Sequence, residues 1–140
     1  MLLSPEDHMA VMNLIADYAF RFDSGDLEGY VDCFAPDGVF DTAAGRHEGQ
    51  QVIRAYVGKL LAARDPAAGP SVRHVMGLPS ITGDSERCQA VSYVTILGQA
   101  ADRVEVRMVG TYTDEIVKID GRWRFAVRNI RMALTKTAAP

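Results

Sequence analysis

The amino-acid sequence predicts an α+β domain in which three N-terminal helices pack on a strongly curved, mixed but mostly antiparallel sheet that encloses a pocket. Apolar residues recur at helical spacing in the first half of the chain, and long β-prone runs separated by turn signals fill the second half. Helices first and strands afterwards is the pattern of the α+β class. The 140 residues have the usual size of one domain, which we expect to span 1–140.

The first helix is predicted to begin at Ser4-Pro5 and to end near Asp23-Ser24-Gly25. Serine can cap a helix, proline suits its first position, and glycine accepts the left-handed conformation at its end. One face between these limits is apolar at helical spacing and carries Val11, Met12, Ile15, Tyr18, Ala19 and Phe22.

Two shorter helices and one strand complete the first half. Asp26 can cap a second helix, because its carboxylate can accept from the backbone of the first turn. Its apolar face carries Leu27, Tyr30, Val31 and Phe34. A turn at Pro36-Asp37-Gly38 precedes a strand over 39–42 and a loop over 43–49. The third helix is expected from Gln50 to about Ala63.

The second half is predicted to be a set of long strands joined by hairpins. The extended runs cover about 71–82, 87–100, 104–119 and 122–135. Gly83-Asp84-Ser85 and Asp120-Gly121 mark two connections, and Ala101-Asp102 marks a third more weakly. Strands of this length predict a twisted and bent sheet. The last five residues, 136–140, are expected to form a frayed tail.

Composition and charge exclude several classes of protein. The apolar fraction of 48% and the charged fraction of 24% are typical of a globular domain. A net charge of −3 does not favour nucleic acid as a partner. No run of 18 apolar residues indicates a membrane span, and the acidic start is unlike a secretory signal. We therefore expect a cytoplasmic protein that binds neither nucleic acid nor membrane.

No motif indicates a metal or a cofactor, and we expect neither. His47-Glu48, with Asp41 nearby, lacks the spacing that places two metal ligands on one helical face. The nucleotide-binding and serine-hydrolase motifs GxGxxG, GxxxxGK and GxSxG do not occur. Cys33 and Cys88 are interpreted as buried small hydrophobic residues, with a nucleophilic cysteine as the alternative.

His74 is the first candidate for chemistry. It alternates with Val72, Met76 and Leu78 on an apolar strand face, so its imidazole is predicted to point inward. An unpaired buried polar group costs about 1–3 kcal/mol, so this ring needs a partner. Histidine is suited to proton transfer near neutral pH, although an inward histidine is also a common core residue.

Asp23, at the end of the first helix, is the candidate partner of His74. A hydrogen bond between them would fix the imidazole tautomer and stabilise the imidazolium formed when the ring removes a proton. The alternative is that Asp23 is a turn or cap residue.

Three further residues are candidates for substrate binding: Tyr18, Arg128 and Asn129. Tyr18 lies on the apolar face of the first helix, where packing alone would also explain it. Simple alternation along 122–135 puts Arg128 on the face opposite Trp123, unless a bulge intervenes, and puts Asn129 on the Trp123 face.

The order of several segments resembles that of SnoaL-like proteins of the nuclear transport factor 2-like superfamily. The segments are residues 18–30, Phe34-Ala35-Pro36-Asp37-Gly38-Val39-Phe40, Gly49 with Ile53, Arg73-His74, and residues 121–125 with Arg128. The nearest branch resembles the one holding scytalone dehydratase, bile-acid 7α-dehydratase and hexachlorocyclohexane dehydrochlorinase. The resemblance covers nearly the whole chain and implies a cone-shaped, cystatin-like roll with a hydrophobic pocket.

The resemblance also implies roles for residues. Asp23 and His74 match an aspartate that orients a histidine, which removes a proton while a leaving group departs. Tyr18 matches a substrate-binding tyrosine, and Arg128 matches a last-strand arginine that reaches the pocket in some members. The chain departs from scytalone dehydratase in lacking a second strand histidine, since only Gly98, Gln99 and Ala100 stand near that position.

These observations predict a lyase, a dehydratase or related β-elimination enzyme, acting without a cofactor on a small hydrophobic molecule. Asp23 and His74 would form its catalytic dyad, and Tyr18 with Arg128 or Asn129 would hold the substrate. The alternatives are a proton-shuttling isomerase or cyclase, a non-catalytic ligand-binding or assembly module, and a subunit like the small subunit of ring-hydroxylating dioxygenases. A homo-oligomer, dimer or trimer, is expected to cover the outer sheet face.

Overall fold

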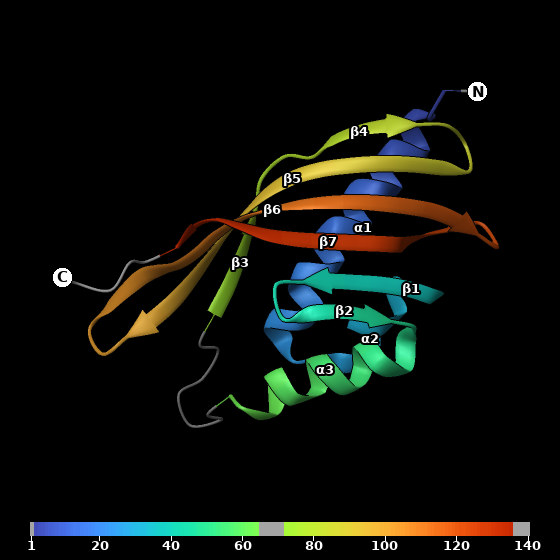
Figure 1. Cartoon of the computed structure of the whole chain (residues 1–140). Coiled ribbons are helices and arrows are strands. Elements are labelled where there is room, and N and C mark those ends of the chain that lie inside the picture. Colours follow the sequence, from blue (N-terminus) through green and yellow to red (C-terminus); the bar gives the residue numbers. More distant parts are fainter. Residues whose placement is uncertain (1, 65–71, 136–140) are drawn as a thin grey trace.

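The computed structural model describes residues 2–64 and 72–135. In these residues, helices pack on one face of a curved seven-stranded sheet (Figure 1). The strand order is β2-β1-β7-β6-β5-β3, and β4 pairs with β5 next to β3. This arrangement confirms the predicted α+β class. Residues 65–71, after the predicted third helix, and the predicted tail at 136–140 lie outside the described residues.

The three helices are α1 (Pro5–Ser24), α2 (Leu27–Asp32) and α3 (Gln50–Ala62). The Ser4 side chain accepts a hydrogen bond from the backbone N–H of Asp7, at 3.1 Å, and caps α1 as the sequence indicated. Gly25 ends α1 in the left-handed conformation, with φ of 78°, which leaves Asp23 in the last turn. None of the helices in the described residues combines the length and the apolar character of a membrane crossing.

The strands confirm three of the four long runs, divide the run at 71–82 into two, and correct two local predictions. The loop predicted at 43–49 contains β2, which pairs with β1 as a hairpin. The turn predicted at 36–38 lies within β1, where the pairing with β7 is interrupted between Phe34 and Val39. The strands are β1 (Phe34–Thr42), β2 (Gly45–Glu48), β3 (Val72–Met76), β4 (Ser80–Gly83), β5 (Arg87–Ala100), β6 (Arg103–Ile119) and β7 (Arg122–Thr135).

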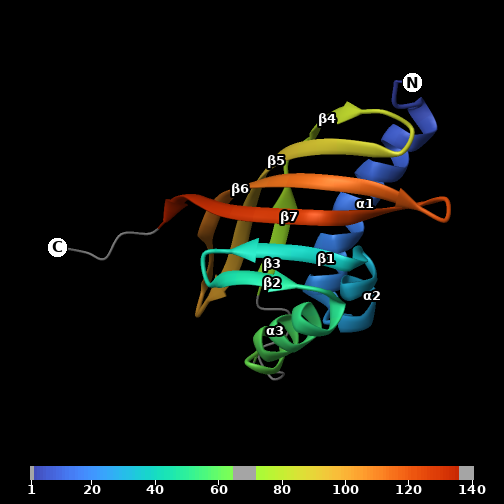
Figure 2. The same cartoon turned by 45° about the vertical axis from the view of Figure 1, so that its right-hand side comes forward.

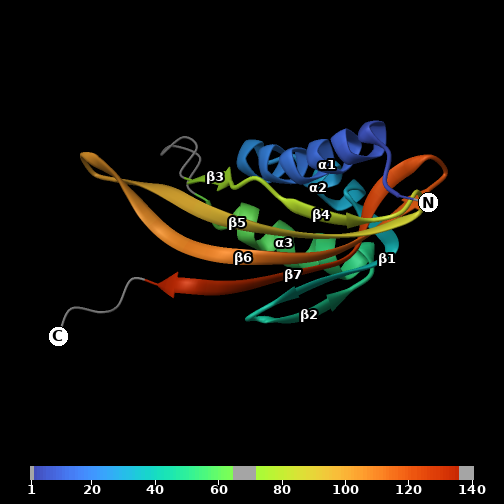
Figure 3. The same cartoon turned by 90° about the horizontal axis from the view of Figure 1, so that it is seen from above.

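The helices and the sheet form two layers with the core between them. Figures 1 and 2 show α1 behind the sheet, running from the β4 side towards the β1–β2 hairpin. Seen from above, α1 and α2 lie over one face of the curved sheet (Figure 3). Burial of apolar surface between these layers is the main favourable contribution to folding. The buried core includes Val11, Ile15, Tyr18, Tyr30, Phe34, Ile53, Val57, Val94, Ile116 and Phe125.

The long run predicted at 71–82 is divided into β3 and β4, with Gly77 and Pro79 between the two strands. β3 pairs with the second half of β5, from Val94 to Gly98, and β4 pairs with the first half. Gly77 lies at the break, where its backbone N–H donates to the carbonyl of Tyr93 at 2.8 Å. A β-carbon at this position would lie 3.2 Å from that carbonyl oxygen. The bend directs β3 towards the end of α1.

A bulge in β7 overturns the simple alternation predicted for its inward side chains. Phe125 pairs with Ile116, and Val127 pairs with the preceding residue of β6, so Ala126 is an extra residue in the ladder. The bulge reverses the side-chain alternation beyond this point. Arg128 is therefore fully buried, with an exposed fraction of 0%, and Asn129 lies on the opposite face.

Candidate functional site

A cavity of about 360 Å³ opens between the helices and the sheet. This volume lies in the range of small-molecule sites. Its walls are mainly aromatic and aliphatic, and its polar groups are few. The residues that line it come from α1, α2, α3 and the inner sheet face, and include Tyr18, Phe22, Tyr30, Phe40, Tyr56, His74, Ile96, Met108, Tyr112 and Ile130.

The structure brings the two predicted catalytic residues together at the edge of this cavity. Asp23 and His74 are 51 residues apart in the sequence, yet Oδ1 of Asp23 lies 2.7 Å from Nδ1 of His74. The second carboxylate oxygen, Oδ2, accepts a hydrogen bond from the backbone N–H of His74 at 2.8 Å. Both side chains are 8% exposed. One carboxylate thus fixes the ring and the backbone of the same residue.

Local structure explains this meeting. β3 is an edge strand, so its outward N–H groups need partners other than a neighbouring strand. The last turn of α1 lies against β3 and presents Asp23 there, because the helix ends two residues later at Gly25. Asp23 is therefore both a structural partner of the strand edge and a partner of the imidazole, so the two sequence interpretations are compatible.

The orientation of His74 leaves one ring nitrogen for a ligand. A carboxylate can only accept, so the neutral ring carries its proton on Nδ1. In residues 2–64 and 72–135, Nδ1 is the ring nitrogen that has a hydrogen-bond partner, which leaves Nε2 available. His74 lines the cavity, and its ring packs edge-on against Phe22 with centroids 5.1 Å apart. An unprotonated imidazole nitrogen at an apolar cavity can act as a general base.

Three tyrosine hydroxyl groups form a second polar cluster in the cavity wall, in addition to Asp23 and His74. Tyr30 donates to the hydroxyl of Tyr18 at 2.7 Å, and Tyr112 donates to the same hydroxyl at 3.4 Å. All three residues line the cavity. Burial raises the pKa of each phenol, although the nearby Arg128 acts against this shift. The hydroxyl groups therefore remain protonated hydrogen-bond donors near neutral pH.

Arg128 lies behind the tyrosines and does not line the cavity. Its guanidinium carbon is 4.1 Å from the ring centroid of Tyr18, 3.6 Å from that of Tyr112 and 4.3 Å from that of Phe125. Such cation–π contacts are worth about 2 kcal/mol or more when they are desolvated. Nη1 lies 3.3 Å from Oδ2 of Asp114, the residue opposite Arg128 in the neighbouring strand.

Asp114 and Arg128 form a fully buried charged pair. Burial raises the pKa of Asp114 from its ordinary value of 3.8 to about 6, although the charge of Arg128 lowers it. Burial disfavours the guanidinium charge, but Asp114 and the tyrosines outweigh this effect and raise the pKa of Arg128. Arg128 therefore remains a cation beneath the tyrosine rings.

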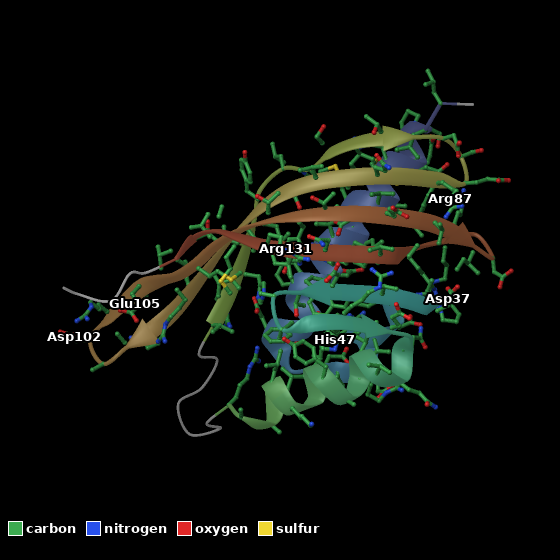
Figure 4. All side chains as sticks on the ribbon, in the orientation of Figure 1. Asp37, His47, Arg87, Asp102, Glu105 and Arg131 are labelled. Carbon is green, nitrogen blue, oxygen red and sulfur yellow. The ribbon has the colours of Figure 1, made fainter. Side chains whose placement is uncertain are left out.

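Asn129 lies on the outer sheet face and is absent from the cavity lining. Its side-chain amide donates to Oδ2 of Asp41 at 3.2 Å. Arg131 contacts the same carboxylate at 3.3 Å, and Figure 4 shows Arg131 on the sheet beside the β1–β2 hairpin. The hydrogen bond to Asp41 accounts for Asn129 as a structural link between β1 and β7.

The two cysteines and His47 do not form a second candidate active site or metal site in the described residues. Cys33 and Cys88 are buried, and burial raises the pKa of both thiols to about 11. His47, labelled in Figure 4 between β2 and α3, stacks on Tyr56 with ring centroids 3.8 Å apart. Within the part of the chain that the structure describes, no three histidine, cysteine or acidic residues are grouped as a metal site.

Sequence reasoning did not identify Tyr30, Tyr112 or Asp114 as functional candidates. A signal existed for Asp114, because Tyr112, Asp114 and Ile116 alternate and would place a carboxylate on an apolar strand face. Tyr30 was predicted only as part of a buried helix face. Their proximity to Tyr18 depends on the packing of α2 and β6, which no local pattern encodes.

The comparison with protein families agrees with this fold. The model of the SnoaL-like domain matches residues 4–129, so the chain belongs to the SnoaL-like family. No curated protein sequence matches the chain.

Solved structures show the same architecture. A protein of unknown function with a cystatin-like fold from Nostoc punctiforme is 24% identical; the match covers 94% of this chain and 95% of that one, with a TM-score of 0.84. A nuclear transport factor 2-like protein from Novosphingobium aromaticivorans is 21% identical, over 91% and 82%, with a TM-score of 0.82. A protein from Catenulispora acidiphila, solved in complex with S-DNPA, is 25% identical, over 92% and 95%, with a TM-score of 0.78.

Proposed function

We propose that the protein is a lyase that catalyses β-elimination, such as dehydration, on a small hydrophobic substrate. The observation that carries this proposal is the hydrogen-bonded pair of Asp23 and His74 at the edge of an apolar cavity. A non-catalytic module would have no need to direct an unprotonated imidazole nitrogen at its ligand.

The reaction balances with this chain's own residues. Nε2 of His74 removes a proton from a carbon atom, and the electron pair forms a carbon–carbon double bond as the β-hydroxyl group departs. The imidazolium returns the proton to the departing oxygen, so the net loss is one water molecule. Asp23 holds the ring and stabilises the imidazolium. A positioned general base contributes typically about 10²–10⁴-fold to the rate.

The cavity walls support a hydrophobic substrate. Aromatic side chains and the methionine Met108 surround the space, so an aromatic or alicyclic molecule gains from leaving water. The hydroxyl group of Tyr18 lies at the centre of the tyrosine cluster, because it accepts hydrogen bonds from both Tyr30 and Tyr112. The Catenulispora protein, solved with S-DNPA, supports the idea that relatives of this chain hold small molecules.

A racemic β-hydroxy ketone, 4-hydroxy-4-phenylbutan-2-one, provides a direct test, because loss of water gives a conjugated enone with strong ultraviolet absorbance. Exchange of its α-hydrogens in deuterated water, followed by NMR, detects proton removal even without elimination. We expect the wild-type protein to catalyse exchange, and both His74→Ala and Asp23→Asn to lose at least about 100-fold of the rate.

His8→Ala serves as the matched control, since His8 lies near the start of α1 and is absent from the cavity lining. Circular dichroism should show the same fold for all variants. The proposal is wrong if His74→Ala exchanges as fast as the wild type, or if the wild type binds the ketone without accelerating exchange.

A proton-shuttling isomerase or cyclase would use the same base and would also show exchange. The products separate these cases: an enone indicates elimination, whereas a rearranged ketone or a new ring indicates isomerisation or cyclisation.

A further inference from the structure

Arg64 follows the end of α3 and directs its side chain to the last turn of α1. Its backbone N–H donates to the carbonyl of Leu61 at 3.2 Å, so it extends the final turn of α3. Its guanidinium carbon lies 4.4 Å from the ring centroid of Phe22, and Nη1 donates to the backbone carbonyl of Asp23 at 3.3 Å. One guanidinium group therefore contacts both the ring that packs against His74 and the residue that holds His74.

The carbonyl of Asp23 needs such a donor because it lies at the end of a helix. The last carbonyls of a helix have no following turn to donate to them. The chain turns away at Gly25, and the backbone N–H groups of Gly25 and Asp26 donate to carbonyls that precede that of Asp23. A cation at this end also interacts favourably with the helix dipole. Arg64 thus stabilises the turn that carries the carboxylate of the dyad.

The side chain of Arg64 occupies this position at a cost. Among the residues that the structure describes, its Nη2 is buried without a hydrogen-bond partner. Burial lowers the pKa of Arg64, although the charge of Asp23 raises it. Arg54, on the same helix, instead pairs with Glu28 through two hydrogen bonds of 2.8 and 3.0 Å. Ion pairing explains Arg54, whereas the contacts with Phe22 and Asp23 are what Arg64 gains.

These contacts also join a wall of the cavity to the dyad. α3 lines the cavity through Tyr56 and Leu60, and it packs against α2 and the β1–β2 hairpin. Arg64 connects the end of this helix to α1. Arg64 itself is absent from the cavity lining, so it acts on a substrate only through other residues.

We propose that Arg64 is a positioning residue that acts through Asp23. By holding the last turn of α1, it keeps the carboxylate where one oxygen reaches the backbone N–H of His74 and the other reaches Nδ1. Its effect on the geometry of the dyad does not depend on turnover. Its effect on the rate rests on the proposed function, because that takes His74 as the base.

The Nδ1 proton of His74 tests this geometry without a substrate, because NMR measures how fast a hydrogen-bonded imidazole proton exchanges with water. We expect Arg64→Met to accelerate this exchange by about 10-fold, the value of one hydrogen bond. Methionine keeps the length of the side chain and can pack on Phe22, but it cannot donate. Arg54→Met is the matched control, since it removes an arginine of α3 that contacts α2 and not the dyad.

Arg64→Lys serves if Arg64→Met does not fold. An ammonium group lacks the planar fork that stacks and donates together, so we expect protection of the Nδ1 proton below that of the wild type. The proposal is overturned if the folded variant protects this proton as well as the wild type does, or if the wild-type proton is not protected.

Hydrogen exchange of 4-hydroxy-4-phenylbutan-2-one tests the consequence for catalysis. We expect Arg64→Met to lower kcat about 10-fold and to leave KM within about twofold, because the cavity lining is unchanged. In the Asp23→Asn background the same substitution should have little further effect, since the carboxylate through which Arg64 acts is gone. Losses that multiply in the double variant would indicate a general structural role and contradict the proposal.

The two measurements separate failure of this proposal from failure of the lyase proposal. Loss of proton protection in Arg64→Met, with no ketone exchange by the wild type, would retain Arg64 as a positioning residue and reject the base. Ketone exchange and proton protection that are both unaffected by Arg64→Met would retain the base and reject the role of Arg64.

Discussion

The carboxylate of Asp23 fixes the orientation and the tautomer of the His74 ring. It accepts one hydrogen bond from the backbone and faces the ring with its other oxygen, so neither the strand nor the imidazole can turn away independently. An asparagine could still accept from the backbone, but its amide N–H₂ would donate to Nδ1 and move the ring proton to Nε2. Asp23→Asn is therefore a test of the tautomer that leaves the packing nearly unchanged.

The buried carboxyl group of Asp114 predicts a pH dependence of stability. Its pKa is raised from 3.8 to about 6, so the protonated form is favoured in the folded protein. This contribution to stability is fully present below pH 3.8 and is lost as the pH rises through about 6. Two pKa units at about 1.4 kcal/mol each give a loss of at most about 3 kcal/mol.

Urea unfolding at pH values between 4 and 7.5 measures this effect for the wild type and Asp114→Asn. We expect the free energy of unfolding of the wild type, relative to that of the variant, to fall as the pH rises through 6. A constant difference between the two proteins over this range would show that Asp114 does not titrate as described.

At the scale of single residues, the sequence predicted the pair of Asp23 and His74 but not the polar cluster beside it. The histidine was conspicuous because it interrupts an apolar alternation, and a buried imidazole requires a partner. Tyr30 and Tyr112 resemble ordinary core aromatics in the sequence. Only their packing around Tyr18 reveals that their hydroxyl groups share protons.

Among the elements, β7 has the greatest influence on the site. The bulge at Ala126 brings Phe125 and Arg128 to the same face, although they are three residues apart. The interruption of the β1–β7 pairing, between Phe34 and Val39, lies opposite this bulge. A regular strand would instead direct the guanidinium to the outer face and leave Asp114 buried without its counterion.

Deletion of Ala126 should therefore reverse the alternation of the rest of β7 and cost at least about 3 kcal/mol, as expected when a buried ion pair is broken. Urea unfolding measures this loss. Deletion of Ala101, at the exposed turn between β5 and β6, is the control and should be tolerated. Equal stability of the two deletion variants would contradict the role given to the bulge.

The sequence predicted elements well where their limits are local and poorly where they depend on distant partners. Ser4 and Gly25 delimit α1 through their own backbone preferences. The bulge in β7 and the strand β2 depend on pairing with β1. Residues 43–49 contain few β-prone side chains, so β2 is held mainly by its ladder with β1.

The whole molecule covers one sheet face with helices and leaves the other without them in the described part of the chain (Figure 3). That outer face carries apolar side chains, among them Val91 and Tyr93, which are 45% and 71% exposed. The β5–β6 hairpin also projects beyond the rest of the sheet, with Asp102 near its tip (Figure 4). These features support the prediction of a homo-oligomer through the outer face.

Size-exclusion chromatography with light scattering at micromolar concentration tests this prediction. We expect a mass that is a multiple of the 15.3 kDa chain, and a shift towards 15.3 kDa for Tyr93→Lys. Phe20→Lys is the matched control, since Phe20 is 72% exposed on α1. A wild-type protein of 15.3 kDa would contradict the prediction.

The ring tautomer of His74 tests the central claim most directly. In ¹⁵N-labelled protein at a pH where the imidazole is neutral, long-range ¹H–¹⁵N spectra identify the protonated nitrogen. We predict the proton on Nδ1 and a free Nε2 in the wild type, and the proton on Nε2 in Asp23→Asn. A wild-type ring that carries its proton on Nε2 would contradict the assignment of His74 as the base.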